Sequence, residues 1–497
     1  MLGSLWLFLF RVHEILAYTM DDSFITYRYA LHAARGQGIT WNVGENPPAE
    51  GYTSFLWLAI LSFAIRLQAD VETTAKLLGI ASVIMTASLI FIAVLRSAKL
   101  PAACLGVALF LSNAHLPAHA VSGMETSAAL LLMTALCFVA AEYLRRPRAL
   151  TACGAGITAL LLGLMRPEMN LAAGVALTLV LILTSKRTTF VLYGLIPWLI
   201  GGAGYFFWRW SYFGLPFPLP FYVKQMGHGL FPGFRPTAAY VIFLWPLYPV
   251  LALFTLRLLR AHREWIPALG GIAAIVFYLI FPAHIMGVDY RFVFPTYGAV
   301  AVFAGLGVGD LLRGEAWPHP RRSTVLVGLA LIFAVFMVQQ RARYRMVRFT
   351  TTTDARGLSA AHIPLGKTLA ALDPDGRHLL AISDAGAVPF YSGWRTIDTF
   401  GLNNREIALG LASGYDTGFV LSSRPDILVL ISNRQEEFDP PLAFEGLLYT
   451  ACRTQGYRRL GTLAYSDEYY LWLMVREAGM ADAVRAALTG RVAAFAE

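Results

Sequence analysis

The stretch MLGSLWLFLFRVHEILAYTMDDSFITYRYA (residues 1–30) places two adjacent aspartates, Asp21 and Asp22, directly after the first apolar segment of the chain. The rest of the chain avoids charge. Only 14% of its 497 residues are charged, whereas about 25% is usual for soluble domains. The pair is therefore expected where the membrane ends and water begins. Two carboxylates there are costly unless a cation, a metal or a substrate offsets them, so we expect at least one to serve function.

A second interpretation of the pair is structural. An aspartate before a helical stretch is a preferred N-cap, because its side chain accepts hydrogen bonds from free N–H groups. Consecutive helical residues diverge by about 100°, so one carboxylate can cap the helix while the other faces a cavity. The sequence leaves open which aspartate caps the helix and which faces the cavity.

The apolar runs are long and do not alternate. Crossing a bilayer takes about 20 mainly apolar residues, and lipid allows the backbone only helices or closed barrels. With 57% hydrophobic residues, we predict a polytopic α-helical membrane protein. The candidate runs cover residues 3–19, 53–68, 74–95, 101–120, 125–143, 149–165, 168–184, 189–210, 237–258, 265–282, 292–311 and 323–338.

The net charge of +9 comes from short basic clusters between these runs. That distribution is the positive-inside pattern of membrane proteins, so it indicates topology and no nucleic-acid partner. The clusters contain Arg145, Arg146 and Arg148, then Lys186 and Arg187, then Arg257, Arg260 and Arg263, and finally Arg313, Arg321 and Arg322.

Placing these clusters in the cytoplasm makes segment 53–68 begin and end outside. The segment is short and amphipathic, so we predict an interfacial helix that lies along the membrane. About eleven spans remain, with the N-terminus inside. This gives a transmembrane domain, residues 1–340, with external loops at 19–72 and 211–236, and an extracytoplasmic domain, residues 341–497.

Residues 341–497 differ from the apolar runs because they contain more charged residues. Short apolar runs at 378–383 and 426–431 predict strands, and the pattern at 365–372 predicts a helix. The segments 457–465 and 468–475 suggest a terminal hairpin. We therefore predict a small α/β domain.

Other predicted external loops carry charges that have two interpretations. Glu125 begins a span, where an acid also meets the positive end of the helix dipole. Arg166 can pair locally with Glu168. The aromatic, proline-rich segment 212–224, which includes Tyr222 and ends at Lys224, suits a prenyl chain with a phosphate at its head.

His284, Asp289 and Arg291 fall on one short external segment. Arg291 can bind phosphate through two hydrogen bonds, or pair with Asp289. The run 305–309 imitates a nucleotide fingerprint, but it lies inside an apolar run with no preceding strand. Close helix packing is the expected explanation.

The chain resembles the mycobacterial-type terminal β-(1→2) arabinofuranosyltransferases, which are members of the GT-C glycosyltransferases. The similarity covers nearly the whole chain, and the most specific parts are the first external loop and the Asp-Ala-Gly stretch at 384–386. It is carried by residues 21–30, 36–38, 41–42, 44–45, 50–57, 122–126, 166–168, 212–218, 224, 289–295, 384–394, 398 and 401–403.

This resemblance implies a GT-C-like fold and a polyprenyl-phosphate-sugar donor, with inversion at the anomeric carbon. The acceptor would be a hydroxyl of a glycan, lipid-linked glycan or protein outside a bacterial inner membrane. Loop 19–72 would carry the catalytic residues, and loop 211–236 would contact the donor. The implied substrate-binding residues are Tyr27, Arg28, Glu50, Tyr52, Glu125, Arg166, Tyr222, Lys224, His284, Asp289 and Arg291.

The chemistry assigns roles to some of these side chains. An acceptor hydroxyl loses its proton as it attacks, so a carboxylate is the natural base, and we assign Asp21 first and Asp22 second. The leaving lipid phosphate needs cations, for which Lys224 and Arg291 are the candidates. A divalent ion (Mg²⁺, Mn²⁺ or Ca²⁺) held by Asp21 and Glu125 stays open as a cofactor.

A transporter or flippase of lipid-linked sugars is the alternative. Such proteins usually show internal repeats and ionisable residues near the bilayer midplane. Here the acids cluster in predicted external loops beside a soluble domain, which favours the transferase.

Overall fold

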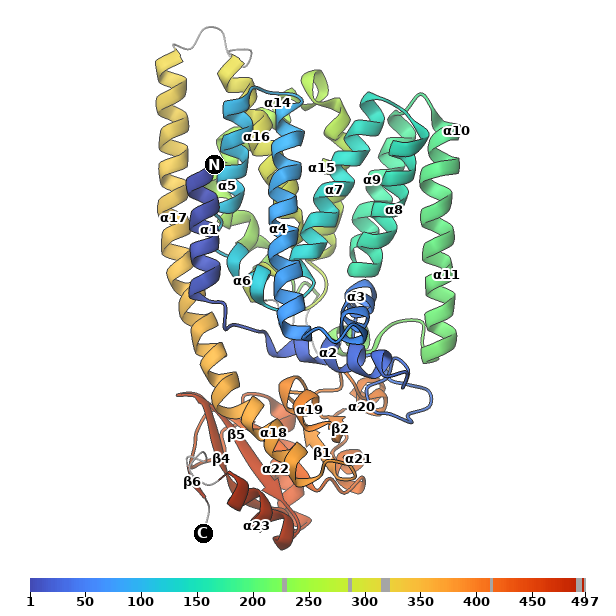
Figure 1. Cartoon of the computed structure of the whole chain (residues 1–497), viewed down its shortest axis with the longest axis vertical. Helices are drawn as coiled ribbons and strands as arrows, with labels where there is room; N and C mark the ends of the chain where they lie inside the picture. The colour runs from blue at the N-terminus through green and yellow to red at the C-terminus, as the bar shows by residue number, and fades with distance from the viewer. Residues whose placement is uncertain (226–229, 285–287, 314–321, 412–413, 489–493, 496–497) are drawn as a thin grey trace.

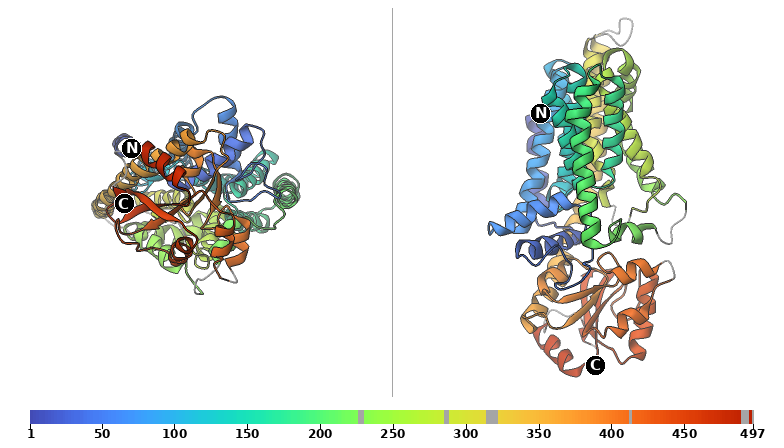
Figure 2. Two further views of the ribbon diagram at one scale, coloured as in Figure 1. Left: turned by 90° about the horizontal axis from the view of Figure 1, so that it is seen from below. Right: turned by 90° about the vertical axis from the view of Figure 1, so that its right-hand side faces the viewer.

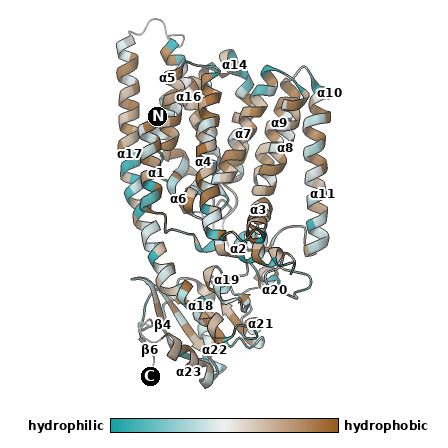
Figure 3. Ribbon diagram, viewed as in Figure 1, coloured by the Kyte–Doolittle hydropathy of each residue, from teal (hydrophilic) through white to brown (hydrophobic). Residues whose placement is uncertain are grey.

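The computed structural model describes residues 1–225, 230–284, 288–313, 322–411, 414–488 and 494–495. The chain forms a bundle of long helices with a small α/β domain at one end (Figure 1). The bundle is apolar over most of its length, with polar residues gathered toward its ends (Figure 3). Parts of the predicted loop 211–236 (residues 226–229), of the segment 284–291 (residues 285–287) and of the last basic cluster (Arg321) lie outside the described residues.

The helices of the bundle follow the predicted apolar runs. Two runs are interrupted: 101–120 divides between two helices, and 237–258 contains a bend of 46°. The elements are α1 (Leu2–Glu14), α4 (Val71–Leu95), α5 (Leu100–Leu111), α6 (Leu116–Val121), α7 (Thr126–Arg145), α8 (Ala149–Met165), α9 (Met169–Leu183), α10 (Arg187–Phe190), η1 (Val191–Leu195), α11 (Ile196–Phe213), α13 (Phe234–Phe243), η2 (Trp245–Leu247), α14 (Tyr248–Ala261), η3 (Arg263–Trp265), α15 (Ile266–Tyr278), η4 (Val288–Tyr290), η5 (Phe294–Thr296), α16 (Tyr297–Arg313) and α17 (Arg322–Gly357).

Glycines bring the central helices into close contact. A Cβ at Gly305 of α16 would lie 2.7 Å from the side chain of Val94, and one at Gly309 would lie 2.5 Å from Ala98. A Cβ at Gly307 would collide with the carbonyl oxygen of Val250. Small residues allow such close approach of helices, so the prediction that the glycine run serves helix packing is confirmed.

Five described helical stretches are long and apolar enough to cross a membrane, and the bent pair α13 and α14 would make a sixth. Four further apolar helices are shorter: Phe55–Arg66, Leu100–Leu111, Ala149–Met165 and Met169–Leu183. The chain is thus a multi-pass helical protein, and the count of eleven spans stays a prediction.

Three helices near the α/β domain interrupt the bundle pattern: α2 (Asp21–Ala34), α3 (Phe55–Arg66) and α12 (Leu219–Gln225). Both α2 and α3 run across the direction of the long helices, between the bundle and the α/β domain (Figures 1 and 2). The segment predicted to be interfacial therefore forms a helix with the expected orientation relative to the bundle. Whether it crosses the membrane stays a prediction.

The α/β domain contains a six-stranded sheet with the order β2-β1-β3-β5-β4-β6. Strand β1 is parallel to β2 and β3, whereas β5 pairs antiparallel with β3 and β4. The predicted strands, helix and terminal hairpin are all present. The elements are η6 (Leu358–His362), α18 (Ile363–Leu372), β1 (Leu379–Ile382), α19 (Ala387–Ser392), β2 (Arg395–Asp398), α20 (Arg405–Gly410), α21 (Thr417–Ser422), β3 (Ile427–Ser432), α22 (Ala443–Thr454), β4 (Arg458–Ser466), β5 (Tyr469–Val475), α23 (Ala478–Ala487) and β6 (Ala494–Phe495).

One continuous helical stretch joins the two parts. Helix α17 passes the predicted boundary at residue 340 without a break and continues through η6 into α18. Hydrogen bonds within the helix satisfy its backbone along this path, so the α/β domain is held to the bundle by a stiff connection.

Candidate active site

Asp21 and Asp22 are the first two residues of α2, and they face different parts of the molecule. The N-cap position belongs to Met20, and no side chain caps this helix. Asp21 Oδ1 accepts a hydrogen bond of 2.8 Å from the backbone N–H of Ala387 in the α/β domain. Asp22 Oδ2 instead pairs with Arg291 Nη1 at 3.1 Å. Consecutive helical residues point in different directions, so Asp21 faces the α/β domain and Asp22 faces Arg291.

Asp21 packs against the segment that follows β1 and is partly exposed. A Cβ at Gly386 would collide with the Asp21 carboxylate, so only glycine permits this approach. Burial raises the pKa of Asp21 to about 7, and the nearby Asp384 carboxylate adds to the rise. His362 and the Ala387 hydrogen bond act in the opposite direction. A carboxylate with a pKa near neutrality is well matched to proton abstraction at physiological pH.

Four predicted side chains meet around the ring of Phe292. Lys224 Nζ lies 4.7 Å from the ring centroid, and the guanidinium carbons of Arg166 and Arg291 lie 5.1 and 5.5 Å from it. The His284 ring is 5.2 Å away, centroid to centroid. Cations within about 6 Å of an aromatic face are attracted to it. We call Arg166, Lys224, His284 and Arg291 the Phe292 cluster.

The members of the Phe292 cluster differ in how they are neutralised. Arg166 Nε pairs with Glu168 at 3.0 Å and with Glu125 at 3.5 Å, and its Nη1 donates to the carbonyl of Arg291 at 2.7 Å. The predicted local pair of Arg166 and Glu168 is therefore confirmed. In the described part of the chain Lys224 Nζ makes neither an ion pair nor a hydrogen bond. Burial and the charge of Arg291 lower the pKa of Lys224 to about 8.

Four residues predicted from loop 19–72 are engaged by other protein groups and fix the loop in place. Arg28 donates to the carbonyls of Trp41 (2.9 Å), Pro389 (2.5 Å) and Trp394 (2.8 Å), which ties α2 to the α/β domain. Glu50 accepts from Arg209 Nε of α11 at 3.0 Å.

Tyr27 and Tyr52 are buried by aromatic neighbours. Tyr27 contacts Phe24 and Phe390, and the Tyr52 ring lies 5.1 Å from Tyr29. These contacts give all four loop residues a packing role.

Two further predicted residues are also engaged elsewhere. Asp289 pairs with His115 Nδ1 at 2.9 Å, rather than with Arg291. His119 hydrogen-bonds the Asp289 carbonyl at 2.9 Å. Tyr222 packs edge to face on Phe221 in the aromatic segment. The predicted alternative in which Arg291 pairs with Asp289 is thus replaced by its pairing with Asp22.

Sequence reasoning missed His362 and Tyr469. Both contact Asp384, which the Asp-Ala-Gly motif did include. Neither residue belongs to a motif, and only the fold brings them behind Asp21.

A metal site was left open from the sequence. Among the described residues, no group of three or more His, Cys, Asp or Glu side chains is arranged to hold a metal ion. Asp21 binds the Ala387 N–H and Glu125 faces Arg166, so each has a separate protein partner. The divalent cation therefore stays a prediction.

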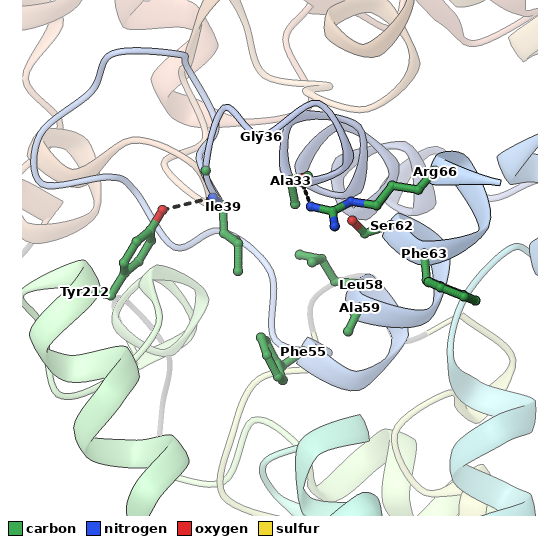
Figure 4. A pocket seen from close by; sticks show the side chains of 11 residues that line it. Ala33, Gly36, Ile39, Phe55, Leu58, Ala59, Ser62, Phe63, Arg66 and Tyr212 are labelled. Carbon is green, nitrogen blue, oxygen red and sulfur yellow. Dashed lines mark hydrogen bonds between the residues drawn. The ribbon is translucent and has the colours of Figure 1, made fainter. Parts of the chain in front are cut away.

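Two hollows lie beside α2. An apolar groove of about 450 Å³ runs between α2, α3 and Tyr212 of α11, with Arg66 at one end (Figure 4). It contains none of the predicted catalytic or substrate-binding residues. A second cavity of about 300 Å³ is lined by Tyr18, Thr19 and Phe24 on one side and by α17 and η6 on the other. That cavity adjoins the first turn of α2.

Comparison with known proteins gives a fold and a partial domain match. Residues 340–480 match a family described as a domain of unknown function (DUF8728). No curated protein matches the chain.

Solved structures of similar fold include proteins bound to a polyprenyl phosphate or to an acceptor peptide. The chain is similar to ArnT from Cupriavidus metallidurans bound to undecaprenyl phosphate, with a TM-score of 0.61, 13% identity and coverage of 96% of this chain and 98% of that one. It is similar to the Archaeoglobus fulgidus oligosaccharyltransferase tethered to an acceptor peptide containing the NVT sequon (TM-score 0.56, 10% identity, coverage 96% and 74%). It is also similar to AglB from the same archaeon, in complex with an inhibitory peptide and a dolichol-phosphate. That comparison has a TM-score of 0.52 and 11% identity, and it covers 86% of this chain and 69% of that one.

At these identities the likeness shows the fold. The chain shares its fold with ArnT and with AglB, and it has several helices long and apolar enough to cross a membrane, as the sequence predicted. The narrower arabinofuranosyltransferase assignment rests on the sequence motifs alone.

Proposed function

We propose that the protein is an inverting glycosyltransferase that moves a sugar, D-arabinofuranose, from a polyprenyl-phosphate donor to a hydroxyl of an extracytoplasmic acceptor. The acceptor is a glycan, a lipid-linked glycan or a protein. One observation carries the proposal: the ion pair of Asp22 and Arg291, at 3.1 Å, joins the acidic turn of α2 to the Phe292 cluster. Glycosyl transfer from a lipid phosphate needs a carboxylate base close to cations that stabilise the leaving phosphate, and this ion pair connects the two.

The Phe292 cluster suits a lipid monophosphate. Arg166 and Arg291 are held by carboxylates, whereas Lys224 contributes a cation with no ion pair in the described chain. As the bond from the anomeric carbon to the phosphate oxygen breaks, negative charge grows on that oxygen. Preorganised cations stabilise that charge in the transition state. The apolar and aromatic residues before Lys224 would accommodate the first part of the prenyl chain.

Asp21 is the proposed base. Its Oδ1 is fixed by the Ala387 N–H, and in the described chain Oδ2 accepts no hydrogen bond. Asp21 is partly exposed, and Oδ2 is the oxygen proposed to take the proton of a substrate hydroxyl. Asp22 is bound to Arg291 and would orient the cation rather than take the proton. The cavity lined by Tyr18, Thr19 and Phe24 adjoins this turn and offers an approach for the acceptor.

The charge distribution supports the proposed orientation in a bacterial inner membrane. Arg145 pairs with Glu264, and Arg313 pairs with Asp310, at the bundle end away from the α/β domain. Basic residues favour the cytoplasmic side. The acidic turn of α2 and the α/β domain would then face outside, where glycan acceptors are assembled.

The test is transfer by the purified protein in lipid nanodiscs. Synthetic polyprenyl-phosphate arabinofuranose and an oligosaccharide acceptor are incubated with wild type and with Asp21→Asn, and products are measured by mass spectrometry. We expect one added pentose with wild type and none with the variant. Release of donor to the opposite leaflet without any transferred sugar would support the transporter instead. Equal transfer of hexose from a matched donor would refute the specificity for arabinofuranose.

A further inference from the structure

The turn just before Arg291 has an unusual backbone conformation. Asp289 and Tyr290 have φ angles of 54° and 63°. Across the described part of the chain, they are the only two consecutive non-glycine residues with positive φ. Residues with a side chain rarely adopt this left-handed region, and a bulky side chain such as that of tyrosine makes it still less favourable. Such a conformation persists only where neighbouring groups hold it, and it is concentrated at functional sites.

Two histidines of the α6 segment hold this turn. His115 Nδ1 donates a hydrogen bond of 2.9 Å to the Asp289 carboxylate, and His119 Nε2 donates one of 2.9 Å to the Asp289 backbone carbonyl. The two histidines are four residues apart, so they lie on one side of the helix. The His115 ring also packs edge to face on Tyr290, at 5.1 Å between centroids. The turn is thus fixed through a side chain, a carbonyl and a ring.

The α6 segment is itself anchored at both ends. Just before it, the backbone N–H of Ala114 donates to Gln340 Oε1 of α17 at 2.8 Å. Just after it, the carbonyl of Ser122 accepts a hydrogen bond of 3.0 Å from the backbone N–H of Met20. Met20 directly precedes the first turn of α2, and α6 lies near the bundle end that faces the α/β domain (Figure 1). One short helix therefore contacts both turns that carry the Asp22–Arg291 ion pair.

Arg291 is held with one donor unused. Its Nη1 pairs with Asp22 at 3.1 Å, and its backbone carbonyl accepts from Arg166 at 2.7 Å. The side chain is only 9% exposed, yet its Nε–H has no hydrogen-bond partner among the described residues. A buried donor without a partner calls for an explanation. A phosphate supplies acceptors that match a guanidinium.

We propose that His115 and His119 are positioning residues, which hold the turn at 289–290 so that the Arg291 guanidinium meets the phosphate of the polyprenyl-phosphate donor. This inference rests on the proposed function, in which Arg291 binds that phosphate. Without the two hydrogen bonds the turn is free to relax to negative φ. That change reorients the peptide before Arg291 and moves its side chain out of the Phe292 cluster. Neither histidine contacts the donor, because both act through Arg291.

The experiment measures binding of undecaprenyl phosphate to the full-length protein by native mass spectrometry. His119→Phe keeps a ring beside Phe294, 4.3 Å away between centroids, but removes the donor to the Asp289 carbonyl. We expect its Kd to rise about three- to tenfold, less than the about 10–150-fold expected when the charged hydrogen bond of Arg291 is itself removed. His115→Phe should act in the same direction. His119→Gln, whose amide nitrogen can replace Nε2, should bind like wild type.

A double-mutant cycle separates positioning from a general loss of stability. In the Arg291→Ala background His119→Phe should cause no further loss of binding, because its effect passes through Arg291. His262→Phe is the matched control. His262 forms a buried pair with Asp310, also at 2.9 Å, at the opposite end of the bundle. Its Kd for undecaprenyl phosphate should equal that of wild type even where its Tm falls.

The outcomes distinguish this inference from the proposed function. Wild-type affinity in both phenylalanine variants would refute the positioning role, and so would an equal loss from His119→Phe with and without Arg291. If His119→Phe does not fold, His119→Asn, whose amide is too short to reach the carbonyl, is compared with His119→Gln and should bind more weakly. Weaker binding in the histidine variants, together with no sugar transfer by wild type, would refute the transferase and support the positioning role. Absence of binding by wild type would refute the proposed donor site.

Discussion

Replacing Lys224 by alanine should weaken the donor specifically. Lys224 Nζ lies 4.7 Å from the Phe292 centroid and has no ion pair or hydrogen bond in the described chain. Its removal therefore leaves no protein group unpaired, and we expect the variant to fold with wild-type stability. What is lost is one charged hydrogen bond to the donor phosphate.

The size of the effect follows from that single interaction. Hydrogen bonds to charged groups contribute about 1.5–3 kcal/mol, and each 1.4 kcal/mol corresponds to about a factor of ten. The donor KM should thus rise by about 10–150-fold. The acceptor KM should stay within about twofold, since a uniform binding term on one substrate does not affect the other. Arg291 shares the phosphate, so the Lys224→Ala and Arg291→Ala effects should be non-additive.

Initial rates at varied donor and saturating acceptor concentrations measure this effect. Arg66→Ala is the matched control, because Arg66 is a cation of the neighbouring groove that donates to the Ala33 carbonyl and lies outside the Phe292 cluster. Its donor KM should equal that of wild type. A Lys224→Ala variant with normal donor KM and raised acceptor KM would show that segment 212–224 contacts the acceptor.

Three further predictions use other parts of the structure. The kcat/KM for donor should rise through about pH 7 as Asp21 ionises and fall above about pH 8 as Lys224 loses its proton, and Lys224→Ala should lack the fall. Asp21→Asn should lose about 10²–10⁴-fold in kcat yet have a higher Tm than wild type at pH 8. The pKa of Asp21 is 3.8 in its ordinary state and about 7 in the folded protein, so between these pH values the folded chain binds more protons than the unfolded chain. The free energy of unfolding therefore falls as pH rises across that window, and asparagine avoids this loss. An equal Tm of the two proteins at pH 8 would contradict this reasoning. Cysteines at Glu45 and Asp70 should both react with an impermeant reagent from outside, whereas labelling of only one would make the segment between them a true crossing.

The helical class of the protein could be predicted because apolar composition is a property of the sequence alone. The C-terminal strands could be predicted for a related reason, since short runs such as Ile427–Ser432 are entirely buried and carry a strong local signal. The interfacial placement of residues 53–68 was inferred from the distribution of basic clusters between the runs, and it stays a prediction.

The active site was only partly accessible to such reasoning. Lys224 was a candidate because it ends an aromatic, proline-rich segment, and Arg291 was a candidate because it shares one short segment with His284 and Asp289. The contact of both with Phe292 depends on tertiary packing, as does the pairing of Asp22 with Arg291 across 269 residues. His362 carries no local signal, because its only distinguishing feature is the carboxylate that the sheet brings to it. Arg28 and Glu50 look like binding residues in the sequence, but buried backbone carbonyls and Arg209 engage them in the structure.

The most direct test of the proposed function is the anomeric configuration of the product. The purified protein is supplied with polyprenyl-phosphate arabinofuranose of one defined configuration and an oligosaccharide acceptor, and the new linkage is determined by NMR. We predict a single added arabinofuranose whose configuration is opposite to that of the donor, with no product from Asp21→Asn. A product that retains the donor configuration, or equal product from wild type and Asp21→Asn, would contradict direct displacement with Asp21 as the base.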